Sequence, residues 1–469
     1  MSRHFDAIVI GAGQAGPSLA GRLTRAGMDV ALVERHLFGG TCVNTGCMPT
    51  KTLVASASAA HLARRAGDYG VVIGASIAID MAKVKARADT VSGNARASVE
   101  AWLRGMERLT VLTGHARFEG PNSVRVGDAL LTAERIFINV GGRARVPDMP
   151  GVDTVPYLTN TSMLALAMVP RHLVVVGGSY IGLEFAQMYR RFGAEVTVVE
   201  MGPRLVGRED EDVSAAVRAV LEREEISIRT NAECIRFAPH VDGVAVGVDC
   251  TSGEPEVVGS HVLLAVGRRP NTDDLGLELA GVDRDPHGYI KVDDQLATNV
   301  PGIWALGDCN GRGAFTHTAY NDYEILAANL LDGDSRRVTD RIPAYALYID
   351  PPLARVGLSE TEARASGRRI LVGKRPMSRV GRAVEKDETQ GFMKIVVDAE
   401  NQRILGATIL GVGGDEAIHS VIDMMAMRAT ATDLRRTMHI HPTVAELLPT
   451  IAGELKPSES GEPGASSGG

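Results

Sequence analysis

The chain has few cysteines, and their number excludes one class of protein. Five cysteines occur in 469 residues, and three of them, Cys234, Cys250 and Cys309, are scattered along the sequence. A disulfide-stabilised scaffold needs a dense and even set of cysteines, so that class is excluded. The other two, Cys42 and Cys47, lie five positions apart in the segment GGTCVNTGCMPTK. Such a pair is a metal-ligand pair, a redox pair or an accident of sequence.

An excess of positive charge and a long apolar run are also missing. Lys and Arg total 50 against 57 Asp and Glu, and the net charge of −7 predicts no nucleic-acid partner. No apolar run reaches the length of a membrane-spanning helix, so no membrane partner is expected. The first residues, MSRHFDAIVIGAG, lead directly into an apolar strand and leave no room for a signal peptide. We therefore expect a cytoplasmic protein, in which a disulfide is usually transient and catalytic.

What the chain does contain is a dinucleotide-binding pattern at its start. An apolar strand runs into the fingerprint Gly11-x-Gly13-x-x-Gly16, and a helix and a second strand follow. The glycines allow a tight turn and a close approach to a pyrophosphate, which the helix N-terminus favours electrostatically. Glu34 ends the second strand, where a carboxylate can accept a hydrogen bond from a ribose hydroxyl. This combination predicts a bound dinucleotide.

A second dinucleotide-binding pattern occupies residues 172–200. Gly177, Ser179 and Gly182 stand at its three fingerprint positions, and Glu200 closes its second strand. The middle position departs from glycine, but serine is small, so we expect binding to survive. Two fingerprints in one chain predict two dinucleotides with an electron path between them.

The rest of the chain divides around these two patterns, as expected because its length needs about two to four hydrophobic cores. Residues 50–112 have the alanine-rich spacing of amphipathic helices, and a short β-rich piece ends near residue 150. An apolar strand precedes Asp308, and a separate α+β character begins near residue 341. The low-complexity segment 457–469 is predicted to be disordered.

The segment GGTC-VNTG-CMPTK after such a fingerprint resembles the class I pyridine nucleotide-disulfide oxidoreductases. That family includes dihydrolipoamide dehydrogenase, glutathione reductase and mercuric reductase, and the resemblance covers about residues 5–455. It implies an α/β fold with two Rossmann-like dinucleotide-binding domains and a C-terminal α+β dimerisation domain. An FAD domain is expected over residues 1–150 and 271–340, an NAD(P) domain over 151–270, and the dimerisation domain over 341–456.

The resemblance implies that Cys42 and Cys47 form a redox disulfide. A nicotinamide delivers two electrons and a disulfide accepts two, and a flavin between them keeps the two substrates apart. By resemblance, Cys47 is held against the flavin and Cys42 attacks the substrate. A thiolate needs a nearby positive charge, and Lys51 follows Cys47 by one helical turn on the same face. In the family such a lysine also approaches the flavin and pairs with a glutamate of the NAD(P) domain, which Glu184 matches.

The segment MHIHPTVAELLPT supplies the acid and base that thiol exchange requires. Its HPTxxE pattern resembles the catalytic dyad of the family, which assigns that dyad to His441 and Glu446. In the family this dyad reaches the disulfide of the other subunit, so a homodimer is expected. His439 is read as an ordinary histidine at the entrance of a helix.

The resemblance implies further contacts with the cofactors. Tyr180 stands where family members carry an aromatic gate over the nicotinamide pocket, with plain packing as the alternative. Asp308 matches the aspartate that accepts a hydrogen bond from the ribityl chain of FAD. His317 is placed near the pyrimidine end of the flavin, or it only packs there. Cys309 is read as a buried structural thiol.

The choice of nicotinamide depends on Glu200. A carboxylate at the end of this strand accepts from the 2′-hydroxyl of NADH and repels the 2′-phosphate of NADPH. Arg204 and Arg208 follow closely and could soften that preference, so NADH is predicted and NADPH stays possible.

The electron acceptor is open between several classes. A lipoamide-like or low-molecular-weight disulfide is the first hypothesis, a mercuric or copper ion the second, and glutathione disulfide the third. No cysteine follows Cys309, which argues against efficient Hg(II) reduction, and no resident metal site is expected. From another class, the chain could be a lipoyl-serving subunit docked on a larger multienzyme complex.

Overall fold

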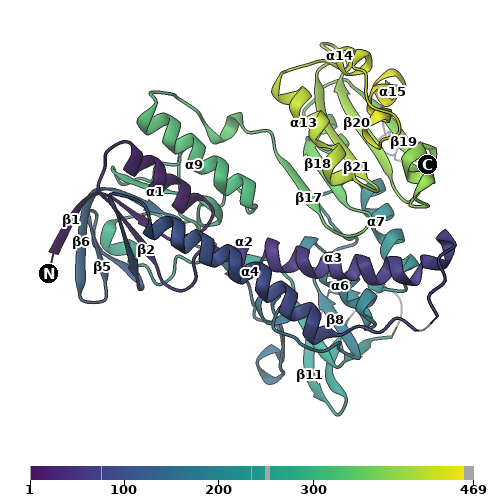
Figure 1. The fold of residues 1–469 in the computed structure, drawn as a ribbon, viewed down its shortest axis with the longest axis horizontal. Coiled ribbons are helices and arrows are strands. Elements are labelled where there is room, and N and C mark those ends of the chain that lie inside the picture. The colour runs from purple at the N-terminus through teal and green to yellow at the C-terminus, as the bar shows by residue number, and fades with distance from the viewer. Residues whose placement is uncertain (1, 75, 234, 249–253, 459–469) are drawn as a thin grey trace, which may run out of the picture.

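The first dinucleotide pattern lies in a sheet whose central strands are parallel (Figure 1). The computed structural model describes residues 2–74, 76–233, 235–248 and 254–458. Residues 7–10 and 30–34, on two neighbouring central strands, are buried throughout, as expected of parallel strands covered on both faces. The strands of the whole sheet, in spatial order, are β3 (Leu109–Thr113), β2 (Val30–Glu34), β1 (Ser2–Ile10), β6 (Ala129–Ile138), β5 (Ser123–Val126) and β4 (Ala116–Gly120). Strand β16 (Ile303–Ala305) also pairs with β6.

Helices cover this sheet and extend from it. Helix α1 (Ala15–Arg25) begins inside the fingerprint and packs beside α9 (Thr316–Leu331), a segment about 300 positions later in the chain (Figure 1). The cysteine segment forms α2 (Gly40–Asn44) and the start of α3 (Cys47–Arg64), which pairs with α4 (Met81–Arg104). The predicted helical stretch is therefore confirmed, with strand β3 at its end.

The second dinucleotide pattern forms its own parallel sheet, and α6 from this unit packs against α3. The sheet contains β10 (Ser227–Arg229), β9 (Glu195–Val199), β8 (His172–Val176) and β14 (His261–Leu264), with α6 (Tyr180–Phe192) and α7 (Glu211–Arg223) between strands. An antiparallel sheet of β11 (Arg236–His240), β12 (Gly243–Gly247) and β13 (Glu256–Gly259) covers the face opposite α6. Helix α5 (Asn160–Met163) lies on the α6 side, where the Tyr189 hydroxyl donates to the Met163 carbonyl. Strands β7 (Gly142–Ala144) and β15 (Arg268–Pro270) pair where the chain enters and leaves this unit.

The C-terminal part is an antiparallel sheet with helices packed on it (Figure 1). Its strands are β17 (Ala344–Leu347), β18 (Leu353–Gly357), β21 (Ile404–Leu410), β20 (Phe392–Asp398), β19 (Ile370–Pro376) and β22 (Lys456–Pro457). Its helices are α10 (Glu360–Ala365), α11 (Gly381–Glu385), α12 (Gly414–Ala417), α13 (His419–Ala426), α14 (Ala431–Arg436) and α15 (Leu448–Gly453). The predicted fold class, two Rossmann-like units and a C-terminal α+β domain, is confirmed.

One boundary of the disordered tail was set too early. Pro457 was placed in that tail, but it pairs with Leu371 in the last strand, and the Ser458 amide donates to the Ile370 carbonyl. A proline is tolerated there because β22 is an edge strand. Residues 459–469 lie outside the described residues. Within the described part of the chain, no helix is long and apolar enough to cross a membrane.

Candidate active site

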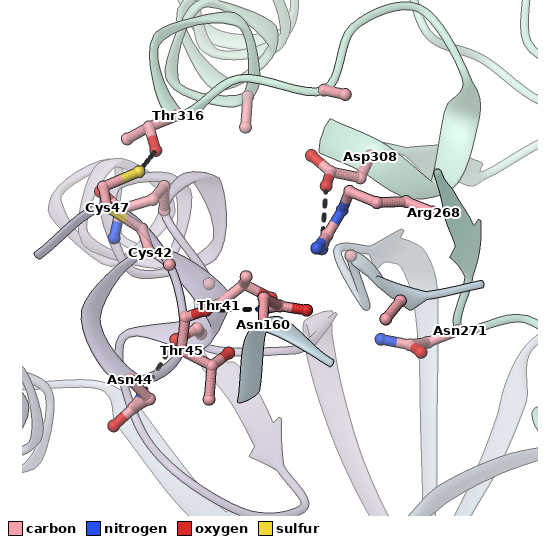
Figure 2. Close-up of a pocket in the computed structure, with 18 of the residues that line it drawn as sticks. Thr41, Cys42, Asn44, Thr45, Cys47, Asn160, Arg268, Asn271, Asp308 and Thr316 are labelled. Carbon is pink, nitrogen blue, oxygen red and sulfur yellow. Dashed lines mark hydrogen bonds and ion pairs between the residues drawn. The ribbon is translucent and has the colours of Figure 1, made fainter. Parts of the chain in front are cut away.

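A cavity of about 840 Å³ connects the first fingerprint to the start of the second. Figure 2 shows the two cysteines and Thr316 on one side of it, with Asp308 and Arg268 on the other. Most of the predicted site residues line this cavity: Gly11, Gly13, Glu34, Cys42, Cys47, Lys51, Ser179, Tyr180, Glu184 and Asp308. Gly16, Gly177, Gly182 and Glu200 are close to it but are not part of its lining.

The first fingerprint has the geometry that a dinucleotide requires. Gly11 has a φ of +107°, and a Cβ on Gly16 would lie 2.2 Å from the Gly11 carbonyl oxygen, so neither position accepts a side chain. The Glu34 carboxylate accepts hydrogen bonds from the backbone amides of Ala12 at 2.9 Å and His36 at 2.8 Å. This fixes the carboxylate at the mouth of the glycine turn, so the residues present fit a bound FAD.

The second fingerprint repeats this geometry almost atom for atom. Gly177 has a φ of +115°, and a Cβ on Gly182 would again lie 2.2 Å from a carbonyl oxygen, that of Gly177. Ser179 has a φ of −114°, which an L residue adopts without strain, so the serine at the middle position is accommodated. The Glu200 carboxylate accepts from the amides of Gly178 at 2.6 Å and Gly202 at 2.7 Å, as Glu34 does in the first unit.

The double glycine before the first cysteine brings the cysteine segment against the first fingerprint. Gly40 has a φ of +62°, and a Cβ there would lie 2.7 Å from the Cα of Gly13. Any larger residue would push α2 away from the glycine turn. The cysteine pair is therefore held beside the site that fits FAD.

The pKa values of the two cysteine thiols are shifted in opposite directions. Both are free thiols here, and Cys47 is the first residue of α3, where the helix N-terminus favours negative charge. The hydrogen bond from Cys42, then the Thr316 hydroxyl and the charge of Lys51, lower the pKa of Cys47 to about 6 against the effect of burial. The same hydrogen bond and burial raise the pKa of Cys42. The reduced pair therefore holds one thiolate, on Cys47, at neutral pH.

Thr316 is a functional candidate that the sequence analysis did not identify. Its Oγ1 lies 3.2 Å from the Sγ of Cys47, and it is the first residue of α9. Two helix N-termini, those of α3 and α9, therefore meet at the Cys47 sulfur. The segment FTHTAY contains both Thr316 and His317, and only His317 is of a residue type typical of catalytic sites. The His317 ring lines the cavity, with its Nε2 2.7 Å from the Ala344 carbonyl oxygen.

Lys51 is paired as the resemblance implied. Its Nζ lies 2.7 Å from the Oε2 of Glu184, and the exposed fraction of the Glu184 side chain is 6%. The second carboxylate oxygen of Glu184 accepts from the Tyr348 amide at 3.0 Å, and the Lys51 ammonium lies 4.7 Å from the centre of the Tyr348 ring. These contacts hold the ammonium in the cavity, near Cys47.

Asp308 lies on the opposite wall, 3.5 Å from the guanidinium of Arg268. Burial raises the pKa of Asp308, with Arg268 acting against this effect. Cys309, the next residue, is fully buried, and burial raises the pKa of this thiol to about 12, so it is an inert structural thiol.

The structure brings His441 and Glu446 together, but not at the cavity. The Nδ1 of His441 lies 2.8 Å from the Oε2 of Glu446, and the exposed fraction of the His441 side chain is 79%. Both belong to the C-terminal domain, and neither lines the cavity that contains the cysteines. In this chain the His441 ring is therefore oriented by Glu446 and projects into solvent.

The acidity of Cys47 leads to a titration test. In the reduced enzyme we expect one thiolate to form with a midpoint near pH 6 and the second only far above pH 9, measured by thiolate ultraviolet absorbance. In Thr316→Val, one hydrogen bond to a charged group is lost, which raises the pKa of Cys47 by about one. Thr316→Ser keeps the hydroxyl and is the matched control. An unchanged midpoint in Thr316→Val would show that the contact does not stabilise the thiolate.

Comparison with known proteins identifies the class. Residues 5–322 match the family described as pyridine nucleotide-disulphide oxidoreductase, and residues 343–452 match the dimerisation domain of the same family. The chain belongs to this family. Its members are flavoprotein enzymes that act on sulfur groups, using FAD and a pyridine nucleotide, and the dimerisation domain supports a homodimer.

Individual relatives cover nearly the whole chain. The probable pyridine nucleotide-disulfide oxidoreductase RclA of Escherichia coli is 36% identical over 96% of this chain and 99% of its own. The dihydrolipoyl dehydrogenase of Thermus scotoductus is 34% identical over 97% and 98% of the two chains. A solved structure of a Cu(II) complex of RclA, an HOCl-induced flavoprotein disulfide reductase, superimposes with a TM-score of 0.88 at 34% identity, covering 97% of this chain and 100% of that chain.

Proposed function

We propose that the enzyme oxidises NADH and reduces a small disulfide, lipoamide-like or of low molecular weight, through Cys42 and Cys47. The balanced reaction is NADH, a proton and RSSR giving NAD⁺ and two RSH. FAD, when bound, carries the two electrons between the nicotinamide and the cysteine pair. The observation that supports this proposal is a single cavity lined by both fingerprint segments and by the paired cysteines.

We further propose how the chain divides. Residues 1–150 and 271–340 form the FAD domain, residues 151–270 the NAD(P) domain, and residues 341–456 the dimerisation domain. The return of β16 to β6 supports a first domain made of two segments, because β16 completes the sheet of the first fingerprint. Within it, Glu34 and Asp308 would hold the ribose and ribityl hydroxyls of FAD.

The cysteines have different tasks in this proposal. Cys47 keeps its thiolate beside the flavin, stabilised by Thr316 and Lys51. Cys42 attacks the substrate disulfide, but its pKa is raised, so it needs a base to remove its proton. His441 of the partner subunit, oriented by Glu446, is proposed as that base and as the acid that protonates the leaving thiol.

The nicotinamide is proposed to be NADH because of Glu200. Two backbone amides hold its carboxylate at the end of the strand, and it would repel a 2′-phosphate. Glu200→Ala is expected to lower the ratio of kcat/KM for NADH to that for NADPH by about tenfold or more. Glu195→Ala, at the exposed start of the same strand, is the control. Equal efficiency of the unmodified enzyme with both nucleotides would contradict the proposal.

A metal-ion acceptor is the second candidate. It is favoured by the high structural similarity to RclA, which has been solved as a Cu(II) complex, and by the mercuric reductase of Bacillus cereus, 32% identical over 94% of this chain and 70% of its own. Within the described residues no cluster of three or more His, Cys, Asp or Glu side chains is arranged to hold a metal. A copper ion would therefore meet the cysteine pair itself.

The experiment that decides between the two is anaerobic stopped-flow reoxidation of the NADH-reduced enzyme. Lipoamide, glutathione disulfide, another small disulfide, Cu(II) and Hg(II) are mixed with it in turn. Rapid recovery of oxidised flavin with an organic disulfide is the expected result. Recovery with metal ions alone would replace the first candidate by the second.

A further inference from the structure

A buried carboxylate lies behind the residue proposed as the nicotinamide gate. The Oε1 of Glu209 accepts hydrogen bonds from the hydroxyls of Tyr180 at 3.0 Å and Tyr345 at 2.6 Å. Glu209 is 2% exposed, and its Oε2 has no hydrogen-bond partner among the described residues. A carboxylate so completely removed from water is costly unless its environment compensates the charge.

That compensation comes from the C-terminal domain. The guanidinium of Arg355, 4% exposed, lies 3.6 Å from Glu209 and donates to the Tyr345 hydroxyl at 3.0 Å. Tyr345 and Arg355 are directly opposed across β17 and β18, so both side chains point to the same face of that sheet. We call Glu209, Tyr345 and Arg355 the Glu209 latch.

The segment that carries Glu209 is also fixed from the C-terminal side. The next residue, Asp210, accepts from the buried ammonium of Lys394 at 2.8 Å and from the backbone amides of Glu360 and Thr361 at 3.0 Å each. These contacts keep Glu209 in place when the Tyr180 side chain moves. Motion of the ring must break the bond to Glu209.

Tyr180 connects this cluster to the cavity. It is the first residue of α6, it lines the cavity, and its ring meets Phe315 and Tyr345 edge to face at 6.2 and 5.4 Å between ring centres. Phe315 precedes Thr316, the partner of the Cys47 sulfur. The Tyr180 ring thus belongs to the second fingerprint and contacts Phe315, next to the cysteine side of the cavity, and its hydroxyl is held by Glu209.

We propose that the Glu209 latch holds Tyr180 closed over the nicotinamide pocket, so that the C-terminal domain sets how readily NADH enters. This rests on the proposed function, with NADH as electron donor, and on the gate role that the family resemblance implies for Tyr180. Glu209, Tyr345 and Arg355 are positioning residues in this account, because they act through Tyr180. When the binding-competent state is only partly populated, the apparent dissociation constant rises by the inverse of that fraction.

The test measures the apparent dissociation constant of NADH from the concentration dependence of flavin reduction in the holoenzyme. In Tyr180→Phe and in Glu209→Gln the constant is expected to fall about tenfold, a factor equivalent to about 1.4 kcal/mol. In the unmodified enzyme, opening breaks the charge-assisted hydrogen bond from the Tyr180 hydroxyl to the Glu209 carboxylate. This bond is absent in Tyr180→Phe and weaker in Glu209→Gln. The double variant should show no further fall in this constant.

Matched controls remove comparable buried groups elsewhere. Tyr189→Phe deletes a buried hydroxyl bond on the same helix, to the Met163 carbonyl, and Glu224→Gln neutralises a partly buried carboxylate paired with Arg191. Neither should change the constant for NADH.

The outcomes separate the inference from the proposed function. Two outcomes would overturn the latch and leave the gate in place. In one, the two effects add in the double variant; in the other, the dissociation constant of NADH falls in Tyr180→Phe but not in Glu209→Gln. No fall in either would overturn both the latch and the gate. If Glu209→Gln does not fold, Tyr180→Phe against Tyr189→Phe still decides, since equal constants in these two contradict the latch. The proposed disulfide reduction is judged independently, from the reoxidation rates.

Discussion

Replacing Cys42 by serine is expected to abolish disulfide turnover while NADH still reduces the flavin at close to the normal rate. A hydroxyl does not ionise at neutral pH and is a poor nucleophile toward a disulfide, so acceptor reduction should fall by about 10³-fold or more. Serine keeps a donor next to Cys47, whose low pKa depends first on the hydrogen bond from position 42. The variant therefore removes the nucleophile with the least change to the flavin-side thiolate.

The measurement is steady-state acceptor reduction together with stopped-flow flavin reduction. Cys309→Ala is the control for loss of a thiol, because Cys309 is buried outside the cavity lining. Turnover of Cys42→Ser at the unmodified rate would show that the acceptor does not react at Cys42.

Replacing His441 by glutamine is expected to lower disulfide turnover by about 10²- to 10⁴-fold, the range typical of a general acid–base group. Cys42 has a raised pKa, so without a base its nucleophilic form becomes scarce. His439→Gln is a close control, since His439 is partly exposed and lies two positions earlier, with its ring near the Thr437 carbonyl. That variant should keep normal turnover.

The same variant tests whether the dyad acts across the dimer. Dimers of Cys42→Ser alone and of His441→Gln alone should both be inactive. A mixed dimer with one chain of each kind, isolated with two different tags, contains one complete site if His441 serves the partner subunit. We expect about half of the normal activity in that mixed dimer, because one of its two sites is intact. No recovery would mean that His441 does not serve the partner subunit, contrary to what the absence of His441 and Glu446 from the lining of their own chain's cavity favours.

The parts of the site that the sequence predicted are those encoded by short, local patterns. Gly11 and Gly177 have the positive φ that opens each fingerprint, and both fingerprint carboxylates are held by the same kind of backbone amides. The pairs Lys51–Glu184 and His441–Glu446 were expected from the family resemblance, and the structure places each pair within 2.8 Å. The roles of these residues in turnover remain predictions.

The parts that were not predicted depend on contacts between segments that lie far apart in the sequence. Thr316 reaches Cys47 from 269 positions away, and Tyr345 reaches Glu209 from 136 positions away. Neither contact can be recognised from a repeat or a fixed spacing in the sequence, because the two partners of each contact belong to different structural elements. The strand at Pro457 was missed for a related reason, since its pairing with Leu371 overrides a composition typical of disorder.

The central claim is that Cys42 and Cys47 receive the electrons of NADH, and counting thiols tests it most directly. The holoenzyme is reduced anaerobically with NADH, quenched in denaturant with an alkylating reagent, and mapped by mass spectrometry. The account predicts two additional alkylated thiols per chain relative to the oxidised enzyme, at Cys42 and Cys47, and their loss again after one equivalent of disulfide acceptor. Full reduction of the flavin with no gain of thiols at these two positions would contradict it.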